Sequence, residues 1–349
     1  MKIALKTLLI AATAASVAAG AATAHAQTRQ NIRVVGSSTV YPFTKAVAER
    51  FAAANRGAST PIVESTGTGG GAKLFCAGLG AQHPDILNAS RRIKLSEFRT
   101  CAANGVTQIT EIQVGLDGIT LAEAKGGLLR NVNLKDIYEA IAANPYGRPN
   151  RAKTWKDVNP SLPAVPIQVY GPPSTSGTRS SIEDLFMEPA CAANPAMQAL
   201  KKTNEAEFNR TCKTIRSDGA YIDAGENDNL IVRKLAANPN AVGLFGYSYL
   251  EENLGKLKGV AVDGVQPSYQ TISSFRYPGA RALYIYVKNA HVKAIPGMRQ
   301  FVAEYVKETT FGPAGYLKTH GLVSSPAAAR QRATRAGAAL TPMTAAGLK

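Results

Sequence analysis

Residues 170–179 read Tyr-Gly-Pro-Pro-Ser-Thr-Ser-Gly-Thr-Arg, and this turn separates a strand-like stretch from a helix-like one. Residues 165–170 before it are mostly apolar, and residues 180–187 after it have a helical pattern. Residues 176–178 should therefore lie where a helix begins and backbone N–H groups lack partners within the helix. Such N–H groups, two hydroxyls and a glycine that permits close approach favour the binding of an anion.

Two further turns in the first quarter of the chain repeat this pattern. Gly-Ser-Ser-Thr at residues 36–39 lies between a strand-like segment and a helix-like one. Residues 64–71, Glu-Ser-Thr-Gly-Thr-Gly-Gly-Gly, also follow a strand-like segment and precede a short helical pattern. Because Ser and Thr are favoured at helix starts for backbone reasons alone, one such turn indicates only a helix cap. Three of them together predict one convergent site.

Strand-like and helix-like segments alternate along the chain, which is typical of α/β folds. A chain of 349 residues exceeds the size at which a single core usually stops growing, so two lobes are expected. Residues 114–123 read as a strand that crosses between lobes, and residues 280–287 read as a strand that returns. The sequence predicts an α/β fold with two hinge-crossing strands, with lobe I at residues 27–116 and 276–325 and lobe II at residues 117–275.

Both ends of the chain have a distinctive composition. Residues 1–26 begin with Lys2 and Lys6, continue with small apolar residues and end in Ala-His-Ala, as signal peptides do. No later apolar run is long enough to span a bilayer, so we expect an exported, soluble protein cleaved near Ala26. Residues 326–349 are rich in Ala and Arg and are expected to form a loosely ordered tail.

The four cysteines all belong to the exported part of the chain. An even number in an oxidising compartment favours disulfides, and the simplest of three connectivities is the local one. It joins Cys76 to Cys101 and Cys191 to Cys212. A zinc site is the alternative, but the chain has no Cys-x-x-Cys and His83 is isolated from the other histidines. We therefore expect disulfides and no metal.

The formal net charge of +16 attracts anions of every kind and identifies none of them. The basic residues are scattered and not interleaved with aromatic residues, so nucleic-acid binding is not expected. A phosphatase or esterase needs a nucleophile beside a base, yet no histidine lies in a motif rich in Ser and Gly. Gly-x-Ser-x-Gly, His-Glu-x-x-His and the Walker A pattern are also absent. The sequence favours binding without catalysis and without a cofactor.

Six segments of the chain, in order, resemble the periplasmic phosphate-binding component of Pst-type ABC importers. They are residues 36–42, 65–73, 88–91, 176–178, 225–229 and 242–247. The resemblance implies a two-lobe periplasmic binding protein of type II that captures inorganic phosphate as a monomer and delivers it to an importer permease with its ATPase. Residues that correspond to the family's binding turns are Ser38, Thr39, Val40, Thr68, Gly69, Ser90, Ser176, Gly177 and Thr178.

The chain departs from the better-known members of that family at two places. Arg91 stands where they have an aspartate, and Pro172 and Ser174 stand where they have an arginine and an aspartate. The chain is more similar to a divergent branch that also reads Asn-Ala-Ser-Arg. We expect Arg91 to restore the lost positive charge, since guanidinium binds oxyanions through two parallel bonds.

The missing aspartate also affects selectivity, because a carboxylate can accept the proton that phosphate carries and sulfate lacks. Asp228, Glu226 and Asp117 are candidate substitutes. Asp228 is favoured because it lies in an acidic turn beside a helix start, although capping that helix explains it equally well. Arg179 either reaches the ligand or is a solvated helix residue. The same fold binding another oxyanion or a phosphorylated small molecule remains the alternative.

Overall fold

The computed structural model describes residues 29–348, and the predicted signal peptide at residues 1–26 lies outside them. The strands are β1 (Arg33–Gly36), β2 (Ile62–Ser65), β3 (Ile86–Ala89), β4 (Ile109–Ala124), β5 (Asn131–Val132), β6 (Val169–Gly171), β7 (Tyr221–Asp223), β8 (Val242–Gly246), β9 (Leu257–Gly259), β10 (Ala261–Val262) and β11 (Ala280–Lys288).

The first helices are α1 (Tyr41–Ala54), α2 (Thr68–Phe75), α3 (Leu95–Ala103), α4 (Leu134–Ile141), α5 (Trp155–Val158), α6 (Gly177–Ile182), α7 (Glu188–Ala192) and α8 (Pro195–Thr203). They are followed by α9 (Glu205–Lys213), α10 (Asp228–Ala237), α11 (Tyr247–Glu251), α12 (Tyr269–Ser273), α13 (Asn289–Val292), α14 (Met298–Tyr305), α15 (Glu308–Phe311) and α16 (Ala327–Ala339). A π-helical turn (Glu183–Met187) joins α6 to α7, and 3₁₀ turns occupy Pro145–Gly147 and Tyr316–His320.

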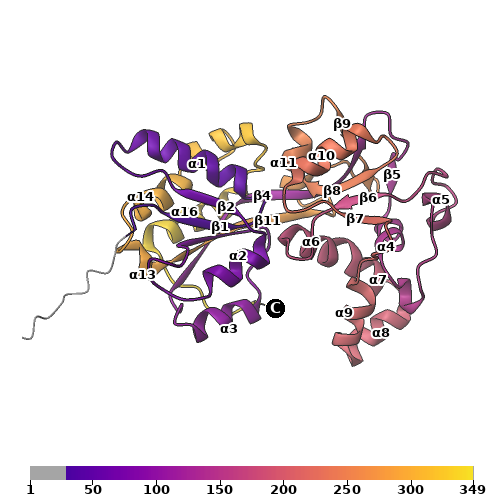
Figure 1. The fold of residues 1–349 in the computed structure, drawn as a ribbon, viewed down its shortest axis with the longest axis horizontal. Coiled ribbons are helices and arrows are strands. Elements are labelled where there is room, and N and C mark those ends of the chain that lie inside the picture. Colours follow the sequence, from indigo (N-terminus) through magenta and orange to yellow (C-terminus); the bar gives the residue numbers. More distant parts are fainter. Residues whose placement is uncertain (1–28, 349) are drawn as a thin grey trace, which may run out of the picture.

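These elements form two lobes that lie side by side (Figure 1). Lobe I contains α1 to α3 with β1 to β3 from the start of the described chain, and α13, α14 and α16 from its end. Lobe II contains the middle of the chain, including β6 to β8 and α4 to α11. The sheet runs in the order β2-β1-β3-β11-β4-β8-β6-β7, with β9 also pairing with β4.

Strand β4 belongs to both lobes. Its first part, up to Gly118, pairs antiparallel with β11, and residues 119–123 pair antiparallel with β8. β11 in turn pairs with β3 and lies between β3 and β4. The chain therefore crosses between the lobes along β4 and again where it enters β11, and the predicted α/β fold of two lobes with two crossing strands is confirmed.

Each lobe has its own apolar core, and that of lobe I covers both faces of its sheet. Neighbouring strand residues point to opposite faces, so Ile285 packs with α1 and α14 while Tyr286 packs with α2 and α3. Strands buried on both faces have nearly continuous apolar sequences, as residues 280–287 do. Lobe II is built around a separate cluster that includes Tyr138, Phe186 and Phe208.

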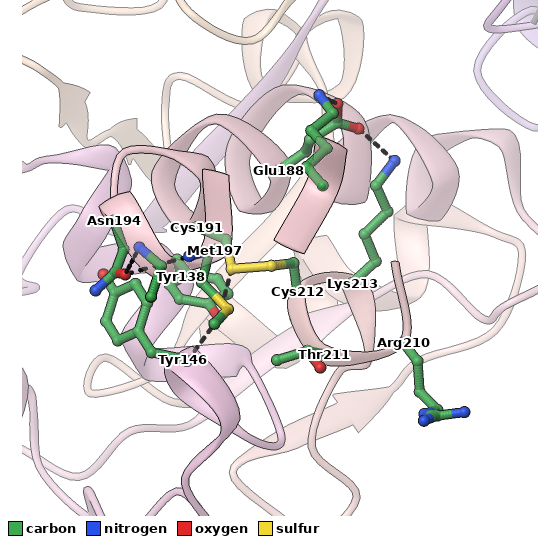
Figure 2. The surroundings of a disulfide bond; sticks show 12 residues. Tyr138, Tyr146, Glu188, Cys191, Asn194, Met197, Arg210, Thr211, Cys212 and Lys213 are labelled. Atoms are coloured by element: carbon green, nitrogen blue, oxygen red, sulfur yellow. Dashed lines mark hydrogen bonds and ion pairs between the residues drawn. A yellow bond between two sulfur atoms is a disulfide. The ribbon is translucent and has the colours of Figure 1, made fainter. Parts of the chain in front are cut away.

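Both predicted disulfides are present. Cys76, at the end of α2, is bonded to Cys101 in α3 of lobe I, and Cys191 in α7 is bonded to Cys212 in α9 of lobe II. Figure 2 shows the second bond, with the Tyr138 ring beside it. The Tyr138 hydroxyl lies 3.1 Å from the Cys191 Sγ. Each disulfide ties together two short helices of the same lobe.

Replacing both Cys191 and Cys212 by serine should lower the free energy of unfolding by about 3 kcal/mol, since the bond closes a loop of roughly 20 residues. Urea unfolding of the oxidised variant and wild type measures the difference. Reductant should destabilise the wild type further than the variant, because only the wild type still has this bond to lose. An unchanged urea midpoint would contradict the prediction.

The expectation of a loose C-terminal tail is wrong. Residues 327–339 form α16, which packs against lobe I through Ala329, Ala333 and Gly337, spaced four residues apart on one buried face. Thr334 and Arg330 fix the helix further by bonds to Val306 O and to Glu308. The segment looked disordered because its apolar stripe consists of small residues, although alanine favours helices strongly.

Within residues 29–348, no helix combines the length and apolar character that crossing a membrane requires.

Candidate functional site

A buried cluster of hydroxyl groups lies between the lobes, where several strands end and helices begin. Lobe I contributes Thr39 from the turn after β1, Thr68 at the start of α2 and Ser90 after β3. Lobe II contributes Ser176 and Thr178 from the turn that begins α6. Each of these five residues has at most 2% of its surface exposed. The structure therefore brings the three predicted turns to one place.

Thr39 and Thr178 make the most direct contact across the lobes. Their Oγ1 atoms are 3.0 Å apart, within hydrogen-bond distance. The Arg281 Nη2 donates to both hydroxyls, at 2.9 Å to Thr39 and 3.0 Å to Thr178. A guanidinium and two hydroxyls from opposite lobes thus converge within one hydrogen-bonded group.

Arg281 is held in place by Asp117 on the neighbouring strand. The two residues are directly opposite in the pairing of β11 with β4, where the chain crosses between lobes. Asp117 Oδ2 accepts from Arg281 Nε at 3.1 Å and Nη2 at 2.8 Å, and Oδ1 accepts from Tyr247 N–H at 2.9 Å. Burial raises the pKa of Asp117, and the attraction of Arg281 opposes that rise. Arg281 Nη1 is buried and has no hydrogen-bond partner among residues 29–348, so it remains available to an anion.

Gly177 fits closely against the second turn. Thr68 Oγ1 lies 3.3 Å from Ser90 Oγ and accepts from Ser90 N–H at 3.2 Å. A Cβ added to Gly177 would lie 2.1 Å from Thr68 Oγ1 and 2.5 Å from Ser90 Oγ. Only a glycine at the start of α6 allows the lobes to approach this closely.

Asp228, the first residue of α10, is fully buried beside this cluster. Its Oδ2 accepts from Gly246 N–H at 3.3 Å, whereas Oδ1 has no hydrogen-bond partner in the described part of the chain. Burial raises the pKa of Asp228 to about 7, with a further contribution from the negative charge of Asp117. A carboxyl group in this state can accept a proton from a ligand near neutral pH or donate its own.

Asp228→Asn should stabilise the ligand-free protein at pH 8 and change its stability little near pH 4. The pKa of Asp228 rises from 3.8 to about 7 on folding, so its contribution to stability is present below pH 4 and is lost as the pH rises through 7. The expected gain at pH 8 is on the order of a few kcal/mol. Urea unfolding in phosphate-free buffer measures it, with Asp223→Asn on the surface as the control. Parallel pH profiles of Asp228→Asn and wild type would contradict the prediction.

The structure does not bring Arg91 or Arg179 to this cluster. Arg91 forms a bidentate ion pair with Glu97, with N–O distances of 2.9 and 2.7 Å. Arg179 bonds to Glu183 and Pro172 O and covers the Tyr221 ring within lobe II. The positive charge assigned to Arg91 is supplied at the cluster by Arg281 instead.

The remaining predicted residues contribute mainly through their backbone. Val40 N–H donates to Ser37 Oγ at 3.3 Å, and Ser38 O accepts from the Tyr249 hydroxyl at 3.2 Å. Gly69 N–H donates across the lobes to Thr175 O at 3.3 Å. In this closed arrangement, the N–H groups of Val40 and Gly69 are thus bonded to protein atoms.

Two α/β lobes that share crossing strands and enclose a buried cluster of hydroxyls, a guanidinium and carboxyl groups define a two-lobe binding protein. Residues 21–309 match the family model described as the PBP superfamily domain. Protein SphX of Synechococcus elongatus is 35% identical over 309 residues, which cover 86% of this chain and 79% of that protein. The phosphate-binding protein PstS of Staphylococcus saprophyticus is 30% identical over 276 residues, covering 76% of this chain and 73% of that protein.

A solved structure shares this fold. The crystal structure of a possible phosphate binding protein from Planctomyces limnophilus superposes with a TM-score of 0.57 at 28% identity, covering 89% of this chain and 98% of that chain. The chain belongs to the PBP superfamily, and relatives at 30% identity or more include proteins named PstS and SphX.

Proposed function

We propose that this protein captures inorganic phosphate between its lobes and hands it, without chemical change, to the permease of an ABC importer. The observation that carries the proposal is the contact of Arg281 Nη2 with the hydroxyls of Thr39 and Thr178 from opposite lobes. A relative at 30% identity is named a phosphate-binding protein, and that similarity supports the same ligand here.

Phosphate binding exchanges contacts within the protein for contacts to the anion. The bond between Thr39 and Thr178 opens, and both hydroxyls donate to phosphate oxygens. Arg281 keeps Asp117 as its partner and offers its unpaired Nη1 to the anion. Charge-assisted hydrogen bonds contribute roughly 1.5 to 3 kcal/mol each, so a few of them suffice for micromolar or tighter binding.

Asp228 gives the site a means of distinguishing phosphate from sulfate. Its unpartnered Oδ1 can accept the proton of hydrogen phosphate, whereas sulfate has no proton to donate and meets a like charge. Because the pKa of Asp228 is about 7, the carboxylate is ionised above that pH. Selectivity for phosphate over sulfate is therefore expected to increase from pH 6 to pH 8.

Titration calorimetry of the ligand-stripped protein with phosphate, arsenate, sulfate and a phosphomonoester tests this proposal. Phosphate should bind with a micromolar or lower Kd, and the ratio of sulfate to phosphate Kd should rise at least tenfold between pH 6 and pH 8. Asp228→Asn should abolish that rise, because it removes the charge that repels sulfate. No heat of binding with any oxyanion would overturn the proposal. Tighter binding of the phosphomonoester than of phosphate would mean that the ligand is a phosphorylated small molecule.

The rest of the proposal concerns the setting in which the protein works. A cleaved leader at residues 1–26 would deliver it to the periplasm, where it would act as a monomer beside the permease and its ATPase. The lobes would hinge near residue 117 and between residues 275 and 280, where the chain crosses. Closure over phosphate would then present one surface, made by both lobes, to the permease.

A further inference from the structure

A cavity lies beside the hydroxyl cluster and is lined by residues of both lobes. Its volume is about 440 Å³, within the range of roughly 300–1,000 Å³ that small-molecule pockets occupy. Lobe I lines it with residues of α2 and α3 and of the segment between β3 and α3, and lobe II lines it with the 174–175 turn and α6. We call it the cleft-mouth site.

Three residues that line this site, Gly69, Arg91 and Thr175, are next in sequence to Thr68, Ser90 and Ser176 of the hydroxyl cluster. The start of α2 contacts the lobe II turn here, where Gly69 N–H donates to Thr175 O at 3.3 Å. The Thr175 side chain donates to Glu226 at 2.6 Å, which holds the turn in place. The hydroxyls of Thr39, Thr68 and Thr178 lie outside the lining of the cleft-mouth site.

The cleft-mouth site has an excess of positive charge. Lys73, Arg91 and Lys94 line it, and the acidic residue in the lining is Glu97, which pairs with Arg91. Within residues 29–348, neither Lys73 nor Lys94 forms an ion pair, although Lys94 is close enough to attract Glu183 across the cleft. Hydroxyl groups come from both lobes, among them Ser96, Thr100, Ser174 and Ser180. Two of them donate to backbone carbonyls: Thr100 to Ser96 O at 2.9 Å and Ser180 to Ser176 O at 3.5 Å.

Arg91 is the most constrained of the three cations. Its side chain is 11% exposed, and Glu97 holds the guanidinium through both Nη atoms. Within residues 29–348, its Nε is buried and has no hydrogen-bond partner. An oxyanion group beside it would satisfy this donor and bring a second negative charge to the three cations.

We propose that the cleft-mouth site binds a small organic or inorganic polyanion carrying two or more carboxylate or phosphate groups. The volume exceeds what one phosphate ion fills, and cations on one wall with hydroxyls on both match a molecule with several oxyanion groups. Because both lobes line the site, its occupant stabilises the closed arrangement and slows the release of phosphate. This inference rests on phosphate being the ligand of the hydroxyl cluster.

The coupling between polyanion binding and phosphate binding can be measured with either ligand, because it is reciprocal. If a polyanion at the cleft mouth raises the affinity for phosphate by some factor, phosphate raises the affinity for the polyanion by the same factor. Citrate and pyrophosphate are the probes, because they separate a preference for carboxylate from a preference for phosphate groups. Each is titrated into phosphate-loaded protein at constant ionic strength, and retention of radiolabelled phosphate shows that the probe joins phosphate and does not displace it.

In wild type, at least one probe should bind with a Kd below millimolar and raise phosphate affinity at least threefold. Lys73→Gln/Lys94→Gln should weaken probe binding at least tenfold and leave the affinity for phosphate alone within about twofold. The matched control, Lys45→Gln/Lys293→Gln, removes the same charge elsewhere on lobe I and should change neither. Equal losses in both variants would mean a general charge effect and would overturn the proposal.

Failure of both probes to bind, or displacement of phosphate by the probe that binds, would also overturn the proposal. Probe binding without any change in phosphate affinity would overturn it as well. The two proposals fail separately. If the stripped protein binds phosphate but neither probe, only the proposal of the cleft-mouth site is contradicted. If it binds a probe but not phosphate, the proposed function is contradicted.

Discussion

Replacing Arg281 by glutamine should raise the Kd for phosphate at least a hundredfold and destabilise the protein. The variant loses the guanidinium that contacts Thr39 and Thr178, and Asp117 becomes a buried carboxylate without its partner. Removing one member of a buried ion pair costs about 3 kcal/mol or more of stability. Calorimetric titration with phosphate and urea unfolding measure the two effects.

A second substitution separates binding from stability. Asp117→Asn/Arg281→Gln removes both charges, so it should recover most of the stability while phosphate affinity stays low. Arg92→Gln is the control, because Arg92 pairs with Glu111 in lobe I outside the cluster. Arg91→Gln should change the affinity for phosphate less than threefold, since Arg91 pairs with Glu97. A larger loss of phosphate affinity in Arg91→Gln than in Arg281→Gln would contradict the proposal that Arg281 supplies the positive charge that binds the anion.

Replacing Gly177 by alanine should also lower phosphate affinity at least a hundredfold, by preventing closure. The new Cβ would lie 2.1 Å from Thr68 Oγ1, closer than any carbon and oxygen can approach without bonding. The backbone at position 177 should tolerate the substitution, because Gly177 has no positive φ and alanine favours the helix that begins there. Calorimetry gives the affinity, and small-angle scattering with phosphate present should show a larger radius than for wild type.

Gly126→Ala is the control for this substitution, because a Cβ at Gly126 meets no atom of residues 29–348 within 4 Å. It should bind phosphate as wild type does. Wild-type affinity in Gly177→Ala would mean that the lobes do not close against Thr68 and Ser90 when phosphate is bound.

Much of the site could be predicted because its hydroxyls lie in local patterns. Thr39, Thr68 and Thr178 each occur in a turn between a strand and a helix, and such turns are recognisable from neighbouring residues alone. The disulfide pairing could be predicted for the same reason, since each bond joins cysteines fewer than 30 residues apart in the sequence. Features fixed by adjacent sequence need no knowledge of how distant strands pair.

Arg281 could not be found in this way, because its role depends on the register between two strands. It lies in the apolar segment 280–287 and faces Asp117, which is 164 residues earlier. The available signal was a charged residue within each crossing strand, Asp117 in residues 114–123 and Arg281 in residues 280–287. Both segments could be identified from the sequence, but the pairing between them could not. Nor does the sequence show that Arg91 pairs with Glu97, six residues later in the first turn of α3.

The position of β11 in the sheet sets the order in which the molecule can assemble. β11 lies between β3 and β4, yet residues 280–288 are synthesised after the whole of lobe II. Lobe II can form from a contiguous stretch of chain, whereas lobe I must wait for its central strand from the last quarter of the sequence. Arg281 arrives on that strand, so the anion site is completed only when nearly the entire chain has emerged.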